Sequence, residues 1–332
     1  MHPTLFWLSL FCFTQVGANA QKLIIGFYNC ENLYDTIHQR KVLDEEFLPG
    51  SNKQYGKVTF ETKAKHIAQN IYALGKLENG NGAAIIGLVE IENRNVIEQL
   101  VSDPLLVKYH YQIIHFESPD PRGIDVALLY SPQHFTPYQY KPISLAQGLH
   151  EKDYPTRDIL YVKGLLENKW VHVFVNHWPS RRGGQAYSEN RRIWASEVLK
   201  HAIDSIQNLD KVAPIIVMGD FNDNPTDKSL KNLPMHNPFI EMFLRGEGSL
   251  AFGDSWHLFD QILISKNLTN TNFDLMYYKS IIYKNKSLIE TRGRYRGYPK
   301  RSWNGDQFNN GYSDHFPVSL ILSLKSVQNP VK

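Results

Sequence analysis

Gly311-Tyr312-Ser313-Asp314-His315-Phe316-Pro317-Val318-Ser319-Leu320-Ile321 is the most informative stretch of this chain. Its second half alternates apolar and polar residues, which predicts a β-strand, and an Asp-His pair directly precedes that strand. Because a strand holds its backbone rigidly, the pair is presented at a fixed geometry. Ser-Asp-His also occurs simply as a cap or turn. The prediction of a functional site therefore depends on four other polar clusters as well. Each follows a strand-like run: Asn29 to Glu31, Glu90, Asn176 to His177, and Asp220 to Asn222.

Short apolar runs bounded by turn-forming residues recur along the chain and predict β-strands. These runs are Leu23 to Tyr28, Ala84 to Val89, Ile124 to Tyr130, Ile159 to Leu166, Trp170 to Val175, Pro214 to Met218, Leu258 to Ile264 and Phe316 to Leu322. Apolar residues at spacings of three and four predict two helices, over Glu61 to Leu77 and Ser188 to Ile206. Many strands with few helices favour two packed sheets with flanking helices. We expect one domain over residues 21–325, followed by a tail at 326–332.

The first twenty residues contain no Lys, Arg, Asp or Glu and predict a secretory signal peptide. Leu5 to Phe13 form its apolar core, and Ala18-Asn19-Ala20 fits the small-x-small pattern of a cleavage site before Gln21. The apolar run is short for a membrane span, although the missing basic side chain leaves an uncleaved anchor as the alternative. Cleavage would remove Cys12 and leave only Cys30, so we expect a secreted or periplasmic protein without an intramolecular disulfide.

The composition is that of an ordinary globular protein, with 42% hydrophobic and 21% charged residues among 332. A formal net charge of +3 permits a polyanionic substrate without requiring one. We expect no stable membrane span in the mature chain, which is taken to be a monomer, and the sequence indicates no protein partner.

The polar clusters suggest chemistry by their residue types alone. Asp220 and Asn222 follow a buried-strand pattern, where they either cap a turn or project a carboxylate and an amide into a cleft. Glu90 ends another strand and, beside Asn29, offers the hard oxygen ligands that Mg²⁺ prefers; otherwise it is a solvated glutamate. His177 precedes a basic turn, although a lone histidine is more often structural. No Cys/His spacing typical of zinc is present.

Six segments together resemble the endonuclease/exonuclease/phosphatase superfamily, which includes relatives of deoxyribonuclease I. They are Tyr28-Asn29-Cys30-Glu31-Asn32, Val89-Glu90-Ile91-Glu92-Asn93, Asn176-His177-Trp178, Gly219-Asp220-Phe221-Asn222, Phe259-Asp260-Gln261-Ile262-Leu263 and Ser313-Asp314-His315-Phe316-Pro317. They occur in the family's order and span nearly all of the mature chain. The resemblance implies an α/β fold, a four-layer sandwich of two central mixed β-sheets flanked by helices, with the active site at one end of the sheets.

The resemblance also implies a divalent cation, Mg²⁺ with Mn²⁺ as a substitute. Glu90 is expected to be the principal metal ligand, helped by Asn29 and by the carboxylates of Glu31 and Asp314. A metal ion offsets the negative charge of a phosphodiester and stabilises the leaving alkoxide.

In the same way, the resemblance assigns catalytic roles. His315 would activate the attacking water, with Asp260 orienting its ring. Asp220 and Asn222 would stabilise the pentacovalent phosphorus and assist proton transfer. His177 matches a second histidine of the deoxyribonuclease-like members. An unperturbed histidine has a pKa near 6.5, so His315 can be neutral at physiological pH and accept a proton.

Further matches are weaker. Asp125 is expected to orient His177. Arg157 resembles a phosphate-contacting arginine, and Arg181 and Arg122 are further candidates for the same role; a solvated arginine is the alternative for each.

The substrate class is predicted from a separate segment of the chain. Residues 292–303 interleave Arg and Lys with Tyr and Trp, a pattern that suits single-stranded nucleic acid or exposed bases. The alternative is a solvated basic loop whose aromatic residues pack on the body. We therefore expect a phosphodiesterase, and first of all an endonuclease acting on DNA or RNA. The second expectation is the same chemistry on a phospholipid headgroup or a small phosphorylated molecule, and the third a binding module without catalysis.

Overall fold

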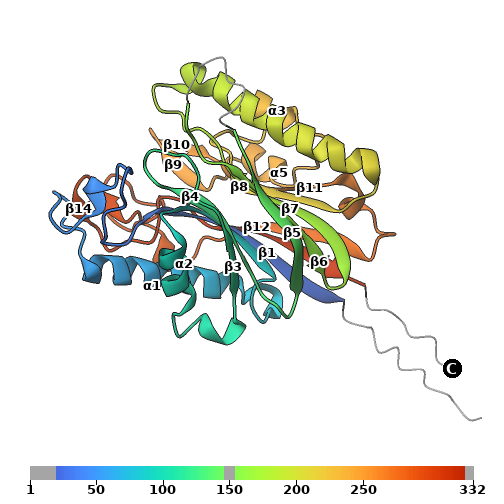
Figure 1. Ribbon diagram of the computed structural model, residues 1–332, viewed down its shortest axis with the longest axis horizontal. Helices are drawn as coiled ribbons and strands as arrows, with labels where there is room; N and C mark the ends of the chain where they lie inside the picture. Colours follow the sequence, from blue (N-terminus) through green and yellow to red (C-terminus); the bar gives the residue numbers. More distant parts are fainter. Residues whose placement is uncertain (1–19, 146–153, 326–332) are drawn as a thin grey trace, which may run out of the picture.

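Two mixed β-sheets lie face to face between layers of helices (Figure 1). The computed structural model describes residues 20–145 and 154–325. Residues 1–19 of the predicted signal peptide and the predicted tail at 326–332 lie outside the described residues. Within the described ranges, no helix is long and apolar enough to cross a membrane.

The first sheet has six strands in the order β12-β15-β1-β2-β4-β3. β1 and β2 pair in parallel, and every other neighbouring pair of this sheet is antiparallel. The strands are β1 (Gln21–Leu33), β2 (Ile85–Ile91), β3 (Gln112–His115), β4 (Asp125–Tyr130), β12 (Leu275–Ile282) and β15 (Val318–Leu324).

The second sheet has five strands in the order β11-β8-β7-β6-β5, with β7 and β8 parallel. Two short hairpins, β9 with β10 and β13 with β14, stand apart from both sheets. The strands are β5 (Phe135–Ile143), β6 (Ile159–Leu166), β7 (Lys169–His177), β8 (Ile215–Asp220), β9 (Leu250–Phe252), β10 (Ser255–His257), β11 (Asp260–Ile264), β13 (Trp303–Asn304) and β14 (Gln307–Phe308).

Helices cover the outer face of each sheet. α1 and α2 pack on the six-stranded sheet, and α3 packs on the five-stranded sheet (Figure 1). The helices are α1 (Lys57–Leu74), α2 (Arg94–Val101), α3 (Gln185–Leu209), α4 (Lys228–Lys231) and α5 (Ile240–Leu244), with short 3₁₀ turns at Glu45–Phe47, Leu77–Asn79, Val107–Tyr109, Lys266–Thr269 and Lys286–Leu288. The predicted four-layer sandwich is therefore confirmed.

The alternation of side chains along β1 explains how this strand is buried on both faces of its sheet. Leu23, Ile25 and Phe27 point into the core between the two sheets, whereas Ile24 and Tyr28 point into the core beneath α1 and α2. Successive residues of a strand face opposite sides of the sheet, so a strand buried on both faces reads as a continuous apolar run. The same rule explains why the buried strands were predictable from their sequences.

The elements that were not predicted lie mainly at the edges. β5 carries mostly exposed side chains and two prolines, so it lacks an apolar run, and proline suits an edge strand because it cannot donate to a ladder. β3, β12, α2 and the two hairpins were also missed. Both predicted helices are present with shifted ends, Lys57–Leu74 and Gln185–Leu209.

Gly87 in β2 supplies a test of the packing between the sheets. A Cβ atom at this position would lie 2.6 Å from Met218 Sδ and 3.0 Å from Phe27, whereas a Cβ at Gly26 on the outer face would make ordinary contacts from 3.4 Å. We predict that Gly87→Ala destabilises the fold by about 1–3 kcal/mol through overpacking, and that Gly26→Ala costs far less. Urea unfolding of both variants measures this. Equal losses for the two glycines would contradict the packing described.

Candidate active site

The pairing of three strands brings the predicted catalytic residues together at one end of the sandwich. Asp220, the last residue of β8, is paired with His177 at the end of β7 and with Asp260 at the start of β11. The other sheet contributes Asn29 from β1 and Glu90 from β2. Because both sheets end here, side chains that lie 191 residues apart in sequence, such as those of Asn29 and Asp220, meet directly.

Irregular backbone aims these side chains. The ladder between β1 and β2 shifts register between Asn29 and Leu33, and the ladder of β2 with β4 shifts across Glu90. Glu31, Glu90 and Asn222 have positive φ angles of 48°, 58° and 50°. Such angles are costly for residues other than glycine and persist where the surrounding structure enforces them, commonly at functional sites. β-bulges next to active sites similarly redirect a side chain.

Asn29 connects the two sheets at this point. Its Nδ2 donates to Glu90 Oε1 over 3.2 Å and to Asp220 Oδ2 over 3.0 Å. Its Oδ1 accepts from the backbone N–H of Glu31 over 2.8 Å. Glu90 Oε2 in turn accepts from the backbone N–H of Asn32 over 3.0 Å. The predicted proximity of Asn29 and Glu90 is thus present, with the amide acting as a bridge between carboxylates.

A divalent metal fits the group formed by Glu90, His177 and Asp220. One potential ligand atom from each lies within 4.8 Å of the others, and His177 Nε2 is 3.7 Å from Glu90 Oε1 and 3.8 Å from Asp220 Oδ2. Two carboxylates match the oxygen preference of Mg²⁺ and Mn²⁺, and His177 adds a nitrogen donor. Carboxylates this close repel one another, which a bound cation would relieve.

His315 and Asp260 form a buried hydrogen-bonded pair. The distance from His315 Nδ1 to Asp260 Oδ2 is 2.6 Å, and Ser249 Oγ donates to the same Oδ2 over 2.5 Å. Both partners are buried, at 8% and 0% exposure. Asp260 Oδ1 has no hydrogen-bond partner within the described part of the chain. The predicted orientation of His315 by Asp260 is therefore geometrically in place. Ser249, which holds Asp260, was not foreseen because no motif surrounds it.

The charges around His315 shift its pKa away from that of an unperturbed histidine. Burial alone would lower the pKa of His315, but the charge and hydrogen bond of Asp260, with the charges of Asp314 and Asp220, hold that pKa well above its ordinary value. This environment favours the protonated form of the His315 imidazole. Positive charge brought close to it would lower its pKa toward the neutral form.

Burial shifts the pKa values of two other titratable groups of the site. Burial raises the pKa of Asp220 to about 7, with the charge of His315 opposing the shift and that of Asp260 adding to it. Burial also lowers the pKa of His177 well below its usual value, and the nearby cations Arg157 and Arg122 lower it further. This environment favours the neutral form of His177, which a metal-binding imidazole requires.

Asn222 is held by two hydrogen bonds, one from its backbone and one from its side chain. Its N–H donates to Asp220 Oδ1 over 2.9 Å, and its Nδ2 donates to the carbonyl of Trp178 over 2.9 Å. The predicted pair of Asp220 and Asn222 therefore forms one rigid turn beside His177.

Glu31 and Asp314, predicted as metal ligands, face Arg301 instead of Glu90. Arg301 Nε lies 3.7 Å from Glu31 Oε1, and its Nη2 lies 3.6 Å from Asp314 Oδ2. Glu31 Oε2 also accepts from the backbone N–H of Ser302 over 2.6 Å. Their role as ligands stays a prediction, and neither belongs to a group of closely spaced potential ligands among the described residues.

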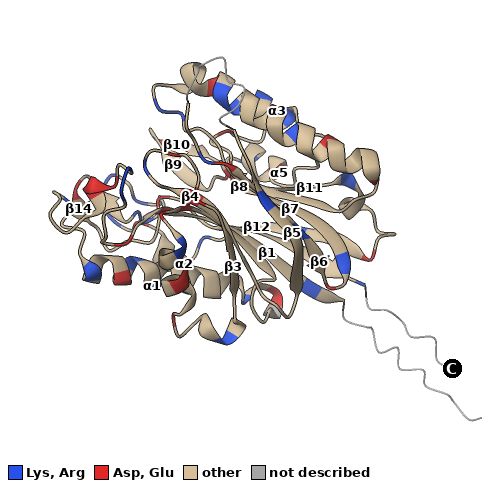
Figure 2. Ribbon diagram, in the orientation of Figure 1, with Lys and Arg blue, Asp and Glu red and all other residues tan. Residues whose placement is uncertain are grey.

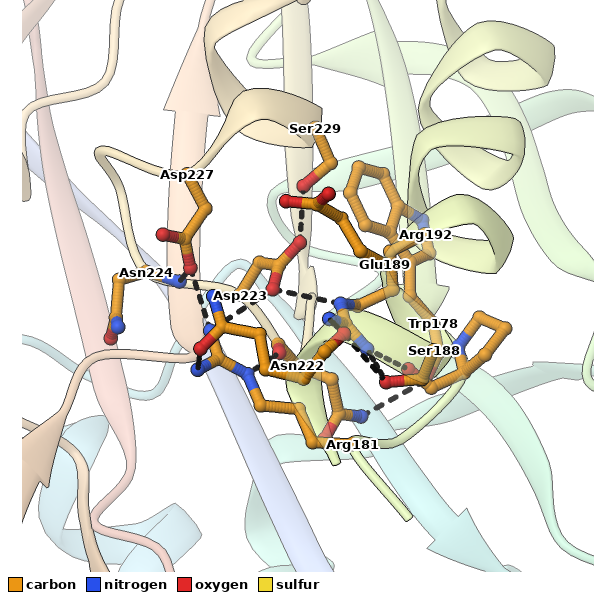
Figure 3. Close-up of polar contacts among 12 residues, drawn as sticks. Trp178, Arg181, Ser188, Glu189, Arg192, Asn222, Asp223, Asn224, Asp227 and Ser229 are labelled. Atoms are coloured by element: carbon orange, nitrogen blue, oxygen red, sulfur yellow. Dashed lines mark hydrogen bonds and ion pairs between the residues drawn. The ribbon is translucent and has the colours of Figure 1, made fainter. Parts of the chain in front are cut away.

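Arg157 and Arg181, predicted to hold phosphate, are engaged by protein groups. Arg157 is buried and donates to Asp120 Oδ2 over 2.9 Å and to the Trp178 carbonyl over 2.6 Å. Arg181 donates to the Asn222 carbonyl, to Gln185 Oε1, and to Asp223 and Asp227 over 3.0 and 2.6 Å (Figure 3). Both guanidinium groups thus support the turns that carry His177 and Asn222, and phosphate binding by them stays a prediction.

Asp223 is the centre of the network beside the site. Figure 3 shows Arg181 and Arg192 converging on it, with Arg192 Nε 2.7 Å from Asp223 Oδ1. Ser229 donates to the other carboxylate oxygen over 2.6 Å. Since Arg192 is fully buried on α3, this ion pair ties the helix to the turn after β8.

The expectation that Asp125 orients His177 is wrong. Asp125 Oδ2 lies 3.0 Å from His115 Nε2, and its Oδ1 accepts from the backbone N–H of Ser118 over 2.8 Å. His177 Nδ1 is buried without a hydrogen-bond partner among the described residues. Asp125 is the first residue of β4, and its two contacts tie that strand to the end of β3 and to the connection that follows it.

The chain belongs to the endonuclease/exonuclease/phosphatase family, whose model matches residues 24–324. A search of the curated proteins found no match. Among solved structures, the catalytic domain of human Nocturnin with bound sulfate is 18% identical, with a TM-score of 0.55 over 92% of this chain and 95% of that one. A mannosyl-6-phosphatase from Bacteroides thetaiotaomicron is 13% identical, with a TM-score of 0.55 over 90% and 99%. Truncated Caenorhabditis elegans TDP2 is 13% identical, with a TM-score of 0.56 over 92% and 98%.

The pKa of His315 gives a direct test of the site's electrostatics. In metal-free protein, we predict that the His315 ring stays protonated to well above pH 6.5, and that Asp260→Asn lowers its pKa because burial remains while the anion is gone. The raised pKa stabilises the fold below pH 6.5, and this contribution is lost as pH rises through the folded pKa. Histidine NMR titration measures both proteins, with His315→Gln identifying the resonance. Identical pKa values of His315 in the wild type and in Asp260→Asn would contradict an electrostatic interaction between the two residues.

Proposed function

We propose that this protein is a divalent-metal-dependent phosphoric ester hydrolase. The observation that carries the proposal is the meeting of a buried His315–Asp260 pair with Asp220, next to the group Glu90, His177 and Asp220. Metal-assisted hydrolysis of a phosphate ester requires a group that transfers protons and carboxylates that bind the metal, and this site has an imidazole beside clustered carboxylates. Membership of the endonuclease/exonuclease/phosphatase family agrees with this chemistry.

Each residue of the site has a part in the proposed reaction. Asp260 accepts a hydrogen bond from His315 Nδ1 and so fixes the tautomer in which the neutral ring has an unprotonated Nε2, which takes the proton from the attacking water. Asp220, with a pKa raised to about 7, carries or releases a proton near neutral pH. Asn222 keeps the turn that presents Asp220, and neutral His177 supplies a nitrogen for a metal or a phosphoryl oxygen.

We propose Mg²⁺ as the cofactor, with Mn²⁺ as a substitute, held by Glu90 and Asp220 with help from His177 and Asn29. When bound, the cation supplies positive charge that stabilises the phosphoryl oxygens and the leaving alkoxide and lowers the pKa of the nearby imidazolium.

We propose nucleic acid as the substrate class, on the basis of the loop over residues 291–297. All seven of its residues are exposed, among them Arg292, Arg294 and Arg296. Tyr295 is 49% exposed, while Tyr298 is tied to the β9–β10 hairpin through Asp254. Figure 2 shows basic and acidic segments mixed on the loops around β14. Exposed arginines beside tyrosines bind backbone phosphates and stack on bases.

A second candidate is a small phosphorylated molecule or a phospholipid headgroup. The structurally similar mannosyl-6-phosphatase favours a sugar phosphate as the alternative. The proposed location is outside the cytoplasm, secreted or periplasmic, on the strength of the uncharged, apolar N-terminal sequence. We propose that the mature chain acts as a monomer.

The test of this proposal is turnover on a substrate panel. Duplex DNA, single-stranded DNA, RNA, a sugar phosphate, sphingomyelin and inositol phosphates are each incubated with Mg²⁺, Mn²⁺ or EDTA. We expect turnover of a nucleic acid with either metal and none after exhaustive chelation. Full activity in EDTA would contradict metal dependence, and turnover of the sugar phosphate alone would favour the second candidate.

Glu90→Gln tests the metal site in the same assay. The substitution removes an anionic ligand while keeping the shape of the side chain, so we predict weaker Mn²⁺ binding together with a lower rate. Calorimetric titration with Mn²⁺ and the hydrolysis rate measure the two effects. Glu98→Gln, at an exposed glutamate on α2, is the matched control. Unchanged metal affinity in Glu90→Gln would remove Glu90 from the ligand set.

A further inference from the structure

Arg301 differs from the other arginines near the site because its guanidinium group makes no hydrogen bond of normal length to the described residues. Arg157 is buried against Asp120, and Arg181 is shared among several oxygen acceptors. Arg122 is 43% exposed but is paired through two nitrogens with Asp120. Arg301 is 52% exposed, and among the described residues its guanidinium makes ion-pair contacts at 3.6–3.7 Å without a hydrogen bond of normal length.

Arg301 lies beside the candidate active site, where it contacts the residue that precedes His315. Its two contacts are Glu31 Oε1 and Asp314 Oδ2. The other oxygen of Asp314 lies 3.9 Å from His315 Nε2, the nitrogen that faces the site. Asp314 therefore links Arg301 to the imidazole, and we expect the long, half-exposed Arg301 side chain to reach an anion bound beside His315. Because a guanidinium is always charged and presents donors in a fixed fork, it suits binding of phosphate oxygens.

The backbone that carries Arg301 is anchored on both sides. Ser302 donates from its N–H to Glu31 Oε2 over 2.6 Å, and its Oγ accepts from the buried Lys63 Nζ over 2.6 Å. On the other side, the N–H of Tyr312 donates to the carbonyl of Lys300 over 2.8 Å. A Cβ atom at Gly311 would lie 2.0 Å from the Arg301 carbonyl, so the two segments are in close contact. The backbone of Arg301 is therefore fixed, while its half-exposed side chain is accessible to a ligand.

We propose that Arg301 binds the non-bridging oxygens of the phosphoryl group that is hydrolysed, exchanging its loose contacts with Glu31 and Asp314 for charge-assisted hydrogen bonds. This inference rests on the proposed hydrolase function and adds a substrate-binding residue to it. It assigns to Arg301 the phosphate-holding role predicted for Arg157 and Arg181. Phosphate monoesters and diesters share the group concerned, so the role is independent of the leaving group.

The experiment measures binding of inorganic phosphate to the Mn²⁺-loaded protein by calorimetry. Mn²⁺ affinity is determined first for each variant, so that every protein is saturated with metal. We expect Arg301→Ala to weaken phosphate binding about 10- to 100-fold, and Arg301→Lys to retain part of the affinity because the charge remains. Arg94→Ala is the matched control, since Arg94 is 54% exposed and pairs with a single carboxylate on α2; its phosphate affinity is expected to be unchanged.

The outcomes separate this inference from the proposed function. Wild-type phosphate affinity in folded, metal-saturated Arg301→Ala overturns the role of Arg301, even if the wild-type enzyme hydrolyses phosphate esters. A change in Mn²⁺ affinity alone also overturns it, because Arg301 would then merely balance Glu31 and Asp314. If Arg301→Ala does not fold, Arg301→Lys decides: affinity equal to wild type contradicts a requirement for the guanidinium fork. Absence of any turnover by the wild type would instead refute the proposed function.

Discussion

The hydrogen bond between His315 and Asp260 determines the electrostatics of the whole site. Asp220 and Asp260 are buried close to the imidazole, and their potential ligand atoms lie within 4.8 Å of one another. Two carboxylates in a poorly solvated cluster repel, and although burial lowers the pKa of His315, the charges of Asp260 and Asp220 hold that pKa above its ordinary value. A general base must be neutral, and positive charge brought close to the imidazole would lower its pKa. Cation binding and activation of His315 are therefore linked by charge.

The residues of this cluster come together because the two sheets end at the same place. The inter-sheet core, from Phe27 on one side to Met218 on the other, sets the distance between Asn29 and Asp220. The register shifts around Glu90 and the positive φ of Asn222 then turn individual side chains toward the centre. Ion pairs outside the cluster, such as Arg192 with Asp223, hold the turns that carry it. Backbone strain at the site is balanced by packing elsewhere.

The buried strands and the members of the site were predictable because each carries a local signal. Continuous apolar runs mark strands that are covered on both faces, and a polar cluster after such a run marks the end of the sandwich. The partners of charged side chains were not predictable, since they depend on contacts between distant segments. Arg157 resembles a phosphate ligand in sequence, yet Asp120, 37 residues away, occupies it. Ser249 supports Asp260 across an interval without any motif. The elevated pKa of His315 likewise arises only when Asp220, Asp260 and Asp314 are assembled around it.

The central claim is that His315 and Asp260 act as one unit, and a double-mutant cycle on the hydrolysis rate tests it most directly. The rates of His315→Ala, Asp260→Asn and the double variant are compared with wild type at saturating metal, with folding of each protein verified. Loss of general acid–base catalysis typically costs ~10²- to 10⁴-fold, and residues acting as a unit are non-additive. The account predicts that the double variant is far less impaired than the product of the two single losses. Fully multiplicative losses would show that His315 and Asp260 act separately and would contradict it.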